Sequence, residues 1–219
     1  MILNDKKFCL IGAGGFGREA LCCLLDMFRA QGHDVRSRTC FMVEDAYYTA
    51  DNKIMGVDVL PLSAFDPALY QVAIAIGDSQ IRKRVVASLP PDTTYGTIIH
   101  PSVLYSEWVE VGEGSILNAG SIVTCNIQIG RHAQLHIHSA VSHDCVIGDF
   151  FTASPAALVS GNCSIGSGVY LGTNSAIRQK ISICDDAFIG MGTVVVKDIT
   201  EPGVYAGNPA RLLCSKHAN

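Results

Sequence analysis

Residues 111–147 read VGEGSILNAGSIVTCNIQIGRHAQLHIHSAVSHDCVI, and every sixth letter of this stretch is Val, Leu or Ile. The same spacing continues to Val195, with Ala153 as the single departure. A step of six residues carries a side chain to the far face of an α-helix, so this period excludes a helix. The repeat instead predicts a parallel β-helix, a solenoid of short flat segments whose aliphatic side chains stack inward.

A second period lies on top of the first. Four glycines follow their aliphatic partners at a spacing of eighteen residues: Gly112, Gly130, Gly148 and Gly166. Eighteen residues therefore make one coil of three faces, and each glycine is expected at a turn where a side chain would clash or cost conformational freedom. Cys145 and Cys163 fall in one column with Ile127 and Ile181, which predicts apolar packing for both thiols.

The first ninety residues have a different pattern. Residues 7–32, KFCLIGAGGFGREALCCLLDMFRAQG, predict a strand, a Gly-rich turn and a helix. Two further strands are expected in TCFMVED (39–45) and QVAIAIGD (71–78), and a second helix in SQIRKRVVASL (79–89). We therefore expect a small Rossmann-like βαβ domain over residues 1–95, followed by the β-helix with a C-terminal cap over residues 96–219.

The Gly-rich turn suggests an anion site. Gly12, Gly14 and Gly17 satisfy G-x-G-x-x-G between a strand and a helix, where free backbone N–H groups suit a diphosphate. Glu44 and Asp45 follow the second strand, where a carboxylate can accept hydrogen bonds from a ribose or a base. The alternative is a glycine turn that only lets the helix pack on the strand.

Composition narrows the function classes. The net charge of −4 and the absence of a long basic run argue against a nucleic-acid partner. No apolar run approaches the ~20 residues of a membrane span, so no membrane insertion is expected. The nine cysteines contain no C-x-x-C pair, which suggests neither a disulfide framework nor a zinc site. We expect a soluble, cytoplasmic protein.

The order of domains and five short motifs resemble the sugar O/N-acyltransferases of the sialic acid O-acetyltransferase and bacillosamine N-acetyltransferase type. The motifs are IGAGGFGRE (11–19), AIAIGDSQIRKRV (73–85), SHDCVIGDF (142–150), YLGTNSAI (170–177) and GVYAGNPA (203–210). This resemblance implies a left-handed β-helix, acetyl-CoA as acyl donor, a nucleotide-linked sugar as acceptor, and a homotrimer with the donor along the coils between subunits. It implies no metal.

The resemblance also implies roles for individual residues. His143 would be the general base, Asp144 its acidic neighbour, and the Gly161 N–H the donor to the thioester oxyanion. Because neighbours on a strand point to opposite faces, a contact from His143 to Asp144 requires a local bend, or else a carboxylate from elsewhere. The acceptor is expected at Gly12, Gly14, Gly15, Phe16, Glu44, Asp45, Gly77 and His136. Acetyl-CoA is expected at Thr152, Thr173 and Met191, with Thr152 and His136 standing where the bacillosamine enzyme has His and Asn.

Three alternatives stay open from the sequence. His138 and His143 have the spacing of two zinc ligands in the carbonic anhydrase branch of this fold, although the third ligand position holds Ser102. A sugar-nucleotide-binding protein without catalysis is the second. The third is O-acetylation of sialic acid or a surface polysaccharide, in place of the N-acetylation that we favour because the Gly-rich domain suits a nucleotide carrier. The nucleotide itself is not determined.

Overall fold

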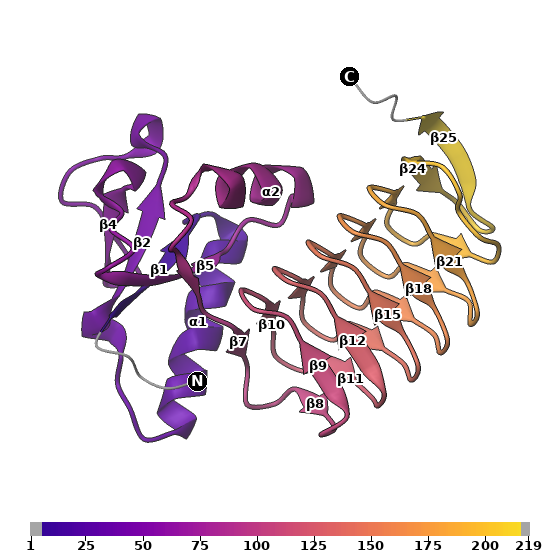
Figure 1. The fold of residues 1–219 in the computed structure, drawn as a ribbon, viewed down its shortest axis with the longest axis horizontal. Coiled ribbons are helices and arrows are strands. Elements are labelled where there is room, and N and C mark those ends of the chain that lie inside the picture. The colour runs from indigo at the N-terminus through magenta and orange to yellow at the C-terminus, as the bar shows by residue number, and fades with distance from the viewer. Residues whose placement is uncertain (1–5, 216–219) are drawn as a thin grey trace.

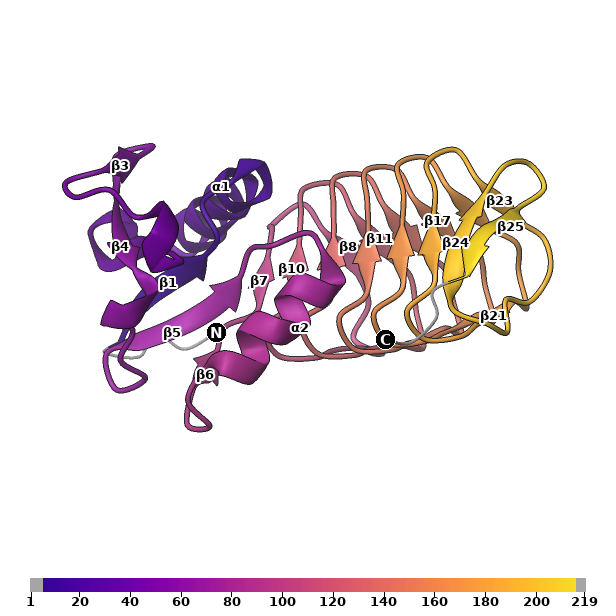
Figure 2. The same cartoon turned by 90° about the horizontal axis from the view of Figure 1, so that it is seen from above.

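The computed structural model describes residues 6–215, which form two parts lying side by side (Figure 1). The first part is an α/β sheet with two helices, and the second is a parallel β-solenoid (Figure 2). This architecture confirms the predicted fold class. Neither helix among the described residues is long and apolar enough to cross a bilayer.

The sheet of the first part has six strands in the order β3-β4-β2-β1-β5-β6, and only β3 runs antiparallel to its neighbour. Its strands are β1 (Lys7–Ile11), β2 (Thr39–Val43), β3 (Lys53–Ile54), β4 (Val57–Pro61), β5 (Tyr70–Ile74) and β6 (Thr94–Tyr95). The predicted strands correspond to β1, β2 and β5. The sequence analysis missed β3 and β6, which have two residues each, and β4, whose VDVLP alternates only briefly before a proline.

Helices α1 (Gly15–Ala30) and α2 (Ser79–Ser88) confirm the two predicted helices. The buried face of α1 includes the five residues that the helical spacing selects: Ala20, Leu21, Leu24, Leu25 and Phe28. Helix α2 begins at an N-cap, because the Asp78 side chain accepts hydrogen bonds from the N–H groups of Gln80 and Ile81. Three short 3-10 helices complete this part at Arg36–Arg38, Asp45–Tyr47 and Leu62–Ala64.

The solenoid has three faces, each a sheet with one strand per coil, and all neighbouring strands are parallel except the terminal pair β24 and β25. The first face comprises β7 (Ile98–Ile99), β10 (Ile116–Leu117), β13 (Gln134–Leu135), β16 (Thr152–Ala153), β19 (Tyr170–Leu171), β22 (Phe188–Ile189), β24 (Gly203–Ala206) and β25 (Arg211–Ser215). The second comprises β8 (Leu104–Tyr105), β11 (Ile122–Val123), β14 (Ala140–Val141), β17 (Leu158–Val159), β20 (Ala176–Ile177) and β23 (Val194–Val195). The third comprises β9 (Val109–Val111), β12 (Ile127–Ile129), β15 (Val146–Ile147), β18 (Ser164–Ile165) and β21 (Ser182–Ile183).

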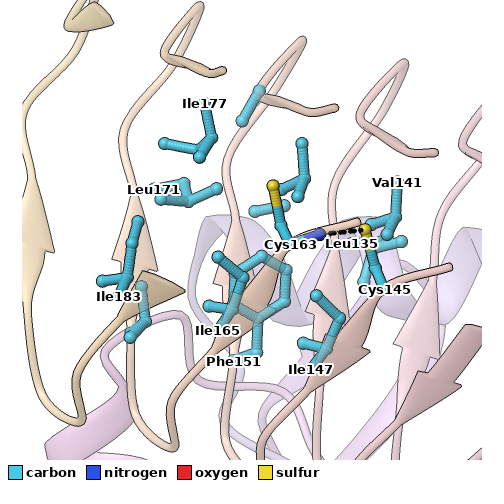
Figure 3. Close-up of a cluster of buried hydrophobic side chains, with 14 of the residues drawn as sticks. Leu135, Val141, Cys145, Ile147, Phe151, Cys163, Ile165, Leu171, Ile177 and Ile183 are labelled. Carbon is cyan, nitrogen blue, oxygen red and sulfur yellow. Dashed lines mark hydrogen bonds between the residues drawn. The ribbon is translucent and has the colours of Figure 1, made fainter. Parts of the chain in front are cut away.

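The six-residue repeat builds the core of the solenoid. Paired residues on adjacent coils lie eighteen apart, as with Leu117 and Leu135. The repeat positions are buried from Leu117 to Val195, and their side chains point into the interior (Figure 3). Cys145 and Cys163 lie in the same interior on successive coils, so their predicted apolar packing is confirmed.

Two backbone features shape the corners. From Asn126 to Gly192, one residue in every six has a positive φ, and most of these residues are not glycine. The glycines at the eighteen-residue spacing have no positive φ. They are required by close approach: a Cβ on Gly148 would lie 2.6 Å from the backbone nitrogen of Ser167 on the next coil. Of the two reasons expected for these glycines, the clash is therefore the correct one.

The described residues end in a hairpin that closes the last coil. Strand β24 pairs with β22 in parallel, and β25 folds back antiparallel to β24. Between them, Gly207 accepts a hydrogen bond from the Val194 N–H, and the Ala210 N–H donates to the Val194 carbonyl. The AGNPA motif thus caps the second face at its final strand, as its position in the sequence suggests.

Gly148→Ala should lower the free energy of unfolding by about 1–3 kcal/mol, the usual cost of forcing an added methyl into a packed interior. Urea unfolding followed by circular dichroism measures this change. Gly15→Ala is the matched control, because nothing lies within 4 Å of a Cβ at that glycine. If the two variants were equally stable, coil-to-coil contact would not be what requires glycine here.

Candidate active site

His143 and Asp144 lie at a corner between β14 on the second face and β15 on the third. Asp144 has φ +59°, and this bend brings the two neighbouring side chains to the same side of the chain. The His143 Nδ1 and the Asp144 Oδ2 are 2.7 Å apart. The local bend that the sequence required for this contact is therefore present, and the His143 side chain stays about half exposed, at 56%.

The Asp144 carboxylate is fixed from two sides. Asn126, one coil earlier, donates from Nδ2 to Asp144 Oδ1 at 2.6 Å. This hydrogen bond, followed by that from His143, holds the pKa of Asp144 below its ordinary value. A carboxylate on Nδ1 favours the tautomer with its proton on Nδ1, which leaves the Nε2 lone pair free to accept a proton. Sequence reasoning missed Asn126, although its position eighteen residues before Asp144 was a usable signal.

Gly161 follows His143 by one coil and lies against its ring. A Cβ at Gly161 would lie 2.6 Å from the His143 Cε1 and 2.7 Å from its Nε2, so only glycine leaves room for the imidazole. The next residue, Asn162, donates its N–H to the His143 carbonyl. The Gly161 N–H itself has no acceptor among residues 6–215. A free donor and an imidazole nitrogen thus lie at the same corner.

The Gly-rich turn borders a cavity of about 350 Å³. Gly14 and Gly15 have nothing within 4 Å of a Cβ, so the start of α1 faces open space. Gly17 is required instead for packing, since a Cβ there would collide with the Gly12 carbonyl. The cavity is lined by residues from the turn, the end of β2, two of the 3-10 helices, the segment after β5, and α2: Ile11, Gly12, Ala13, Gly14, Met42, Val43, Glu44, Tyr47, Leu62, Ile76 and Val85.

The two acidic candidates have different surroundings. Glu44 lines the 350 Å³ cavity. Asp45 does not, and its Oδ1 accepts the Ser63 N–H at 3.0 Å. This hydrogen bond holds the pKa of Asp45 below its ordinary value. The structure therefore brings Glu44, and not Asp45, to the cavity beside the Gly-rich turn.

A second cavity, of about 300 Å³, lies between the start of α2 and the first face of the solenoid. Gly77 and His136 both line it, together with Asp78, Ser79, Gln80, Gly168, Tyr170, Ala187 and Phe188. Phe16 stacks on the His136 ring with 4.3 Å between centroids. Burial, with a smaller contribution from Arg82, lowers the pKa of His136 to about 4, so this ring is neutral at pH 7. Its Nε2 has no partner among the described residues.

The three residues expected at acetyl-CoA do not share one environment. Thr152 is fully buried, and its hydroxyl donates to the Gly77 carbonyl at 3.1 Å while it accepts from Arg82 at 2.9 Å. That hydroxyl is committed to contacts between the two parts of the chain. Thr173 and Met191 follow β19 and β22 at the edge between the first and second faces, and Met191 is exposed.

The predicted site residues therefore form two groups within one chain. His143 and Gly161 lie at the edge between the second and third faces. The 300 Å³ cavity, with His136, lies against the first face, and Thr173 and Met191 lie at the edge of that face with the second. The second face separates these groups. No group of three His, Cys, Asp or Glu side chains within residues 6–215 is arranged to hold a metal ion.

These features together define a hexapeptide-repeat protein with a His-Asp pair on its coils and a nucleotide-sized cavity in its α/β part. The family model described as the PglD N-terminal domain matches residues 7–89. WeeI from Acinetobacter baumannii AYE is similar over 95% of this chain and 100% of its own, with 32% identity and a TM-score of 0.85. The chain belongs to the PglD-type sugar N-acetyltransferases, a hexapeptide-repeat family with a left-handed β-helix.

Two further similarities concern proteins whose ligands or activities are named. PerB from Caulobacter crescentus, solved in complex with CoA and GDP-perosamine, is 26% identical with a TM-score of 0.82, over 97% of this chain and 99% of its own. GDP-perosamine N-acetyltransferase of Escherichia coli O157:H7 is 33% identical over 130 residues, which are 56% of this chain and 55% of that protein. The match thus spans about half the length of that curated relative.

The Asp144 environment can be tested directly. Asn126→Gly removes one of the two hydrogen bonds to the carboxylate and should raise the pKa of Asp144 toward its ordinary value. Glycine avoids new strain, because Asn126 has φ +54°. Carboxyl ¹³C shifts followed through a pH titration measure the change.

Asn162→Gly is the matched control, since Asn162 lies one coil after Asp144 and has φ +60°. It should leave the titration of Asp144 unchanged. Equal shifts in the two variants would mean that the coil, and not the Asn126 amide, sets the ionisation of Asp144.

Proposed function

We propose that this protein transfers the acetyl group of acetyl-CoA to the amino group of a nucleotide-linked amino sugar, such as a UDP- or GDP-linked 4-amino-4,6-dideoxy sugar. The proposal is carried by one observation: His143, oriented by Asp144, lies beside the free Gly161 N–H on a solenoid joined to a cavity of nucleotide size. The named relatives support it, since GDP-perosamine is a nucleotide-linked amino sugar.

The chemistry follows from the residue types. The sugar amine attacks the thioester carbonyl carbon, the C–S bond breaks, and CoA leaves with the sulfur. His143 Nε2 accepts the proton that the amine loses, and the Asp144 carboxylate stabilises the imidazolium. The proton then passes to the CoA sulfur. The Gly161 N–H stabilises the negative charge on the carbonyl oxygen in between.

The acceptor is divided between the two cavities in this proposal. The nucleoside occupies the 350 Å³ cavity with Glu44, the diphosphate lies over Gly14 and Gly15, and the hexose extends toward Gly77 and His136. A neutral His136 can donate or accept a hydrogen bond without charge repulsion from an amine. Acetyl-CoA and nucleotide sugars are cytoplasmic metabolites, so the reaction is placed in the cytoplasm.

We also infer that the functional unit is a homotrimer. The second face carries an outward apolar row in register that includes Leu104, Ile122 and Leu158, which are 65%, 39% and 47% exposed. A neighbouring copy on this row would bring its own edge with His143 toward the edge with Met191. Sedimentation velocity that returns a monomer at micromolar concentration would overturn this arrangement.

The activity is tested with acetyl-CoA and a panel of UDP-, GDP- and dTDP-linked amino sugars. Release of free CoA thiol is followed with a colorimetric thiol reagent. The acetylated product is identified by mass spectrometry, and its resistance to hydroxylamine shows that it is an amide. Turnover with at least one member of the panel supports the proposal and names the carrier. A hydroxylamine-labile product would indicate an ester and therefore O-acetylation.

His143→Ala should lower kcat by roughly 10²–10⁴-fold, the scale for losing a general base, because no other group then takes the proton from the amine. Acetyl-CoA affinity, measured by calorimetry, should stay within about twofold of wild type if binding and proton transfer are separate. Asp144→Asn should cost less, since the imidazole itself remains.

His138→Asn is the control for the His143 variant. His138 is an exposed corner residue with φ +57°, a conformation that asparagine tolerates, and it should be replaceable without loss of kcat. If His143→Ala kept half of the wild-type kcat, another group must remove the proton.

Gly14→Val should raise KM for the nucleotide sugar at least about tenfold and leave KM for acetyl-CoA nearly constant. Gly14 has φ −71°, and nothing lies within 4 Å of a Cβ, so valine fits the folded chain but fills the space expected for the diphosphate. Gly14→Ala should give a smaller rise. Equal increases for both substrates would mean that the turn only supports folding.

A further inference from the structure

Arg82 on α2 is fully buried although it carries a charge. Burial lowers its pKa to about 9, so the guanidinium still holds its proton at neutral pH. Among residues 6–215 no carboxylate forms an ion pair with Arg82. An unpaired buried charge is costly unless hydrogen bonds satisfy it, so its partners decide what Arg82 does.

The partners of Arg82 are six neutral oxygens, and they come from both parts of the chain. Nη1 donates to the carbonyls of Ile76 and Gly77, at 2.6 and 3.2 Å, directly after the sheet strand β5. Nε and Nη2 donate to oxygens of two successive coils: His132 O at 3.0 Å, Phe150 O at 2.8 Å, Phe151 O at 3.2 Å and Thr152 Oγ1 at 2.9 Å. The planar guanidinium fixes all these directions at once.

Stability alone does not account for an arginine here. Packed apolar side chains stabilise an interior at least as well as a buried charge, whereas a charge with many directed bonds specifies one arrangement. A second contact between the two parts, Lys83 with Asp186 at 2.5 Å, is partly exposed and makes no bond to the Ile76-Gly77 backbone. Arg82, unlike Lys83, therefore holds the Ile76-Gly77 backbone.

The segment that Arg82 holds connects the two cavities. Ile76 lines the 350 Å³ cavity and Gly77 lines the 300 Å³ cavity. The Gly77 carbonyl accepts from both Arg82 and the Thr152 hydroxyl, so this backbone is tied to the coil. On its other side Gly77 has nothing within 4 Å of a Cβ and is open toward a ligand.

We infer that Arg82 is a positioning residue that fixes the Ile76-Gly77 backbone on the solenoid, and through it the sugar end of the nucleotide sugar relative to the coils. The inference rests on the proposed function, because it assigns the 300 Å³ cavity to the acceptor sugar. Arg82 touches neither substrate in this assignment and acts through Gly77.

The test compares Arg82→Met and Arg82→Lys with wild type in steady-state kinetics and in calorimetry with the nucleotide sugar, with the free nucleoside diphosphate, and with acetyl-CoA. Arg82→Met should raise KM and Kd for the nucleotide sugar at least about tenfold, with the values for acetyl-CoA within about twofold. Affinity for the free nucleoside diphosphate should change less, since it leaves the 300 Å³ cavity empty. Arg82→Lys should recover part of the loss.

Lys83→Met is the control, because it removes a neighbouring charged contact between the two parts, with Asp186, and should leave KM for the nucleotide sugar unchanged. If Arg82→Met does not fold, Arg82→Lys and Thr152→Val carry the test. Thr152→Val removes the second bond to Gly77 and one of the six acceptors of Arg82, and it should raise the same KM more modestly. A folded Arg82 variant with wild-type KM, or with equal losses for both substrates, overturns the inference alone. A wild-type protein that neither binds nor acetylates the nucleotide sugars overturns the proposed function as well.

Discussion

The contact between successive coils is the constraint on which the rest of this molecule depends. Each coil lies so close to the next that a Cβ on Gly148 would lie 2.6 Å from the backbone of its neighbour. At that spacing the aliphatic side chains stack in one buried core, and through the regular coils residue i lies beside residue i+18. The corner at His143 and Asp144 uses this rule twice, since Asn126 contacts Asp144 and Gly161 lies against His143. The period that makes the core also assembles the site.

The corners of the coils bring the side chains of neighbouring residues together, which flat strands cannot do. Adjacent side chains on a strand point to opposite faces, yet His143 and Asp144 are 2.7 Å apart because Asp144 has a positive φ. Such residues recur every six positions, so the bend at Asp144 is a regular part of the coil and needs no special loop. The fold thus offers a bent dipeptide at every corner, and the site uses one of them.

The sequence predicted the solenoid well because six-residue periodicity depends only on which residues are aliphatic. The sequence was less informative about the surroundings of individual side chains, because these depend on contacts between distant segments. His132 lies at a turn and is buried between Tyr95 and Phe150, a contact that the hexapeptide period does not indicate. His136 is partly buried and stacks on Phe16 of the other part. Asp45 was expected at the nucleotide, but its carboxylate accepts a hydrogen bond from the N–H of Ser63, eighteen residues away in another 3-10 helix.

The joint between the two parts explains why the contacts of Arg82 and Thr152 could not be predicted from the sequence. Arg82 belongs to RKR (82–84), where three adjacent charges give no sign of burial, yet Arg82 is buried because α2 packs against the coils. Thr152 lies directly before the repeat position Ala153, yet its hydroxyl donates a hydrogen bond to the Gly77 carbonyl of the other part. Neither polar group has its full set of hydrogen-bond partners unless both parts are present. A joint built from directed bonds to backbone oxygens holds one geometry between the α/β part and the coils. In the proposed trimer, a neighbouring copy docks on these coils and supplies the base, so a fixed joint is what would place the sugar relative to that base.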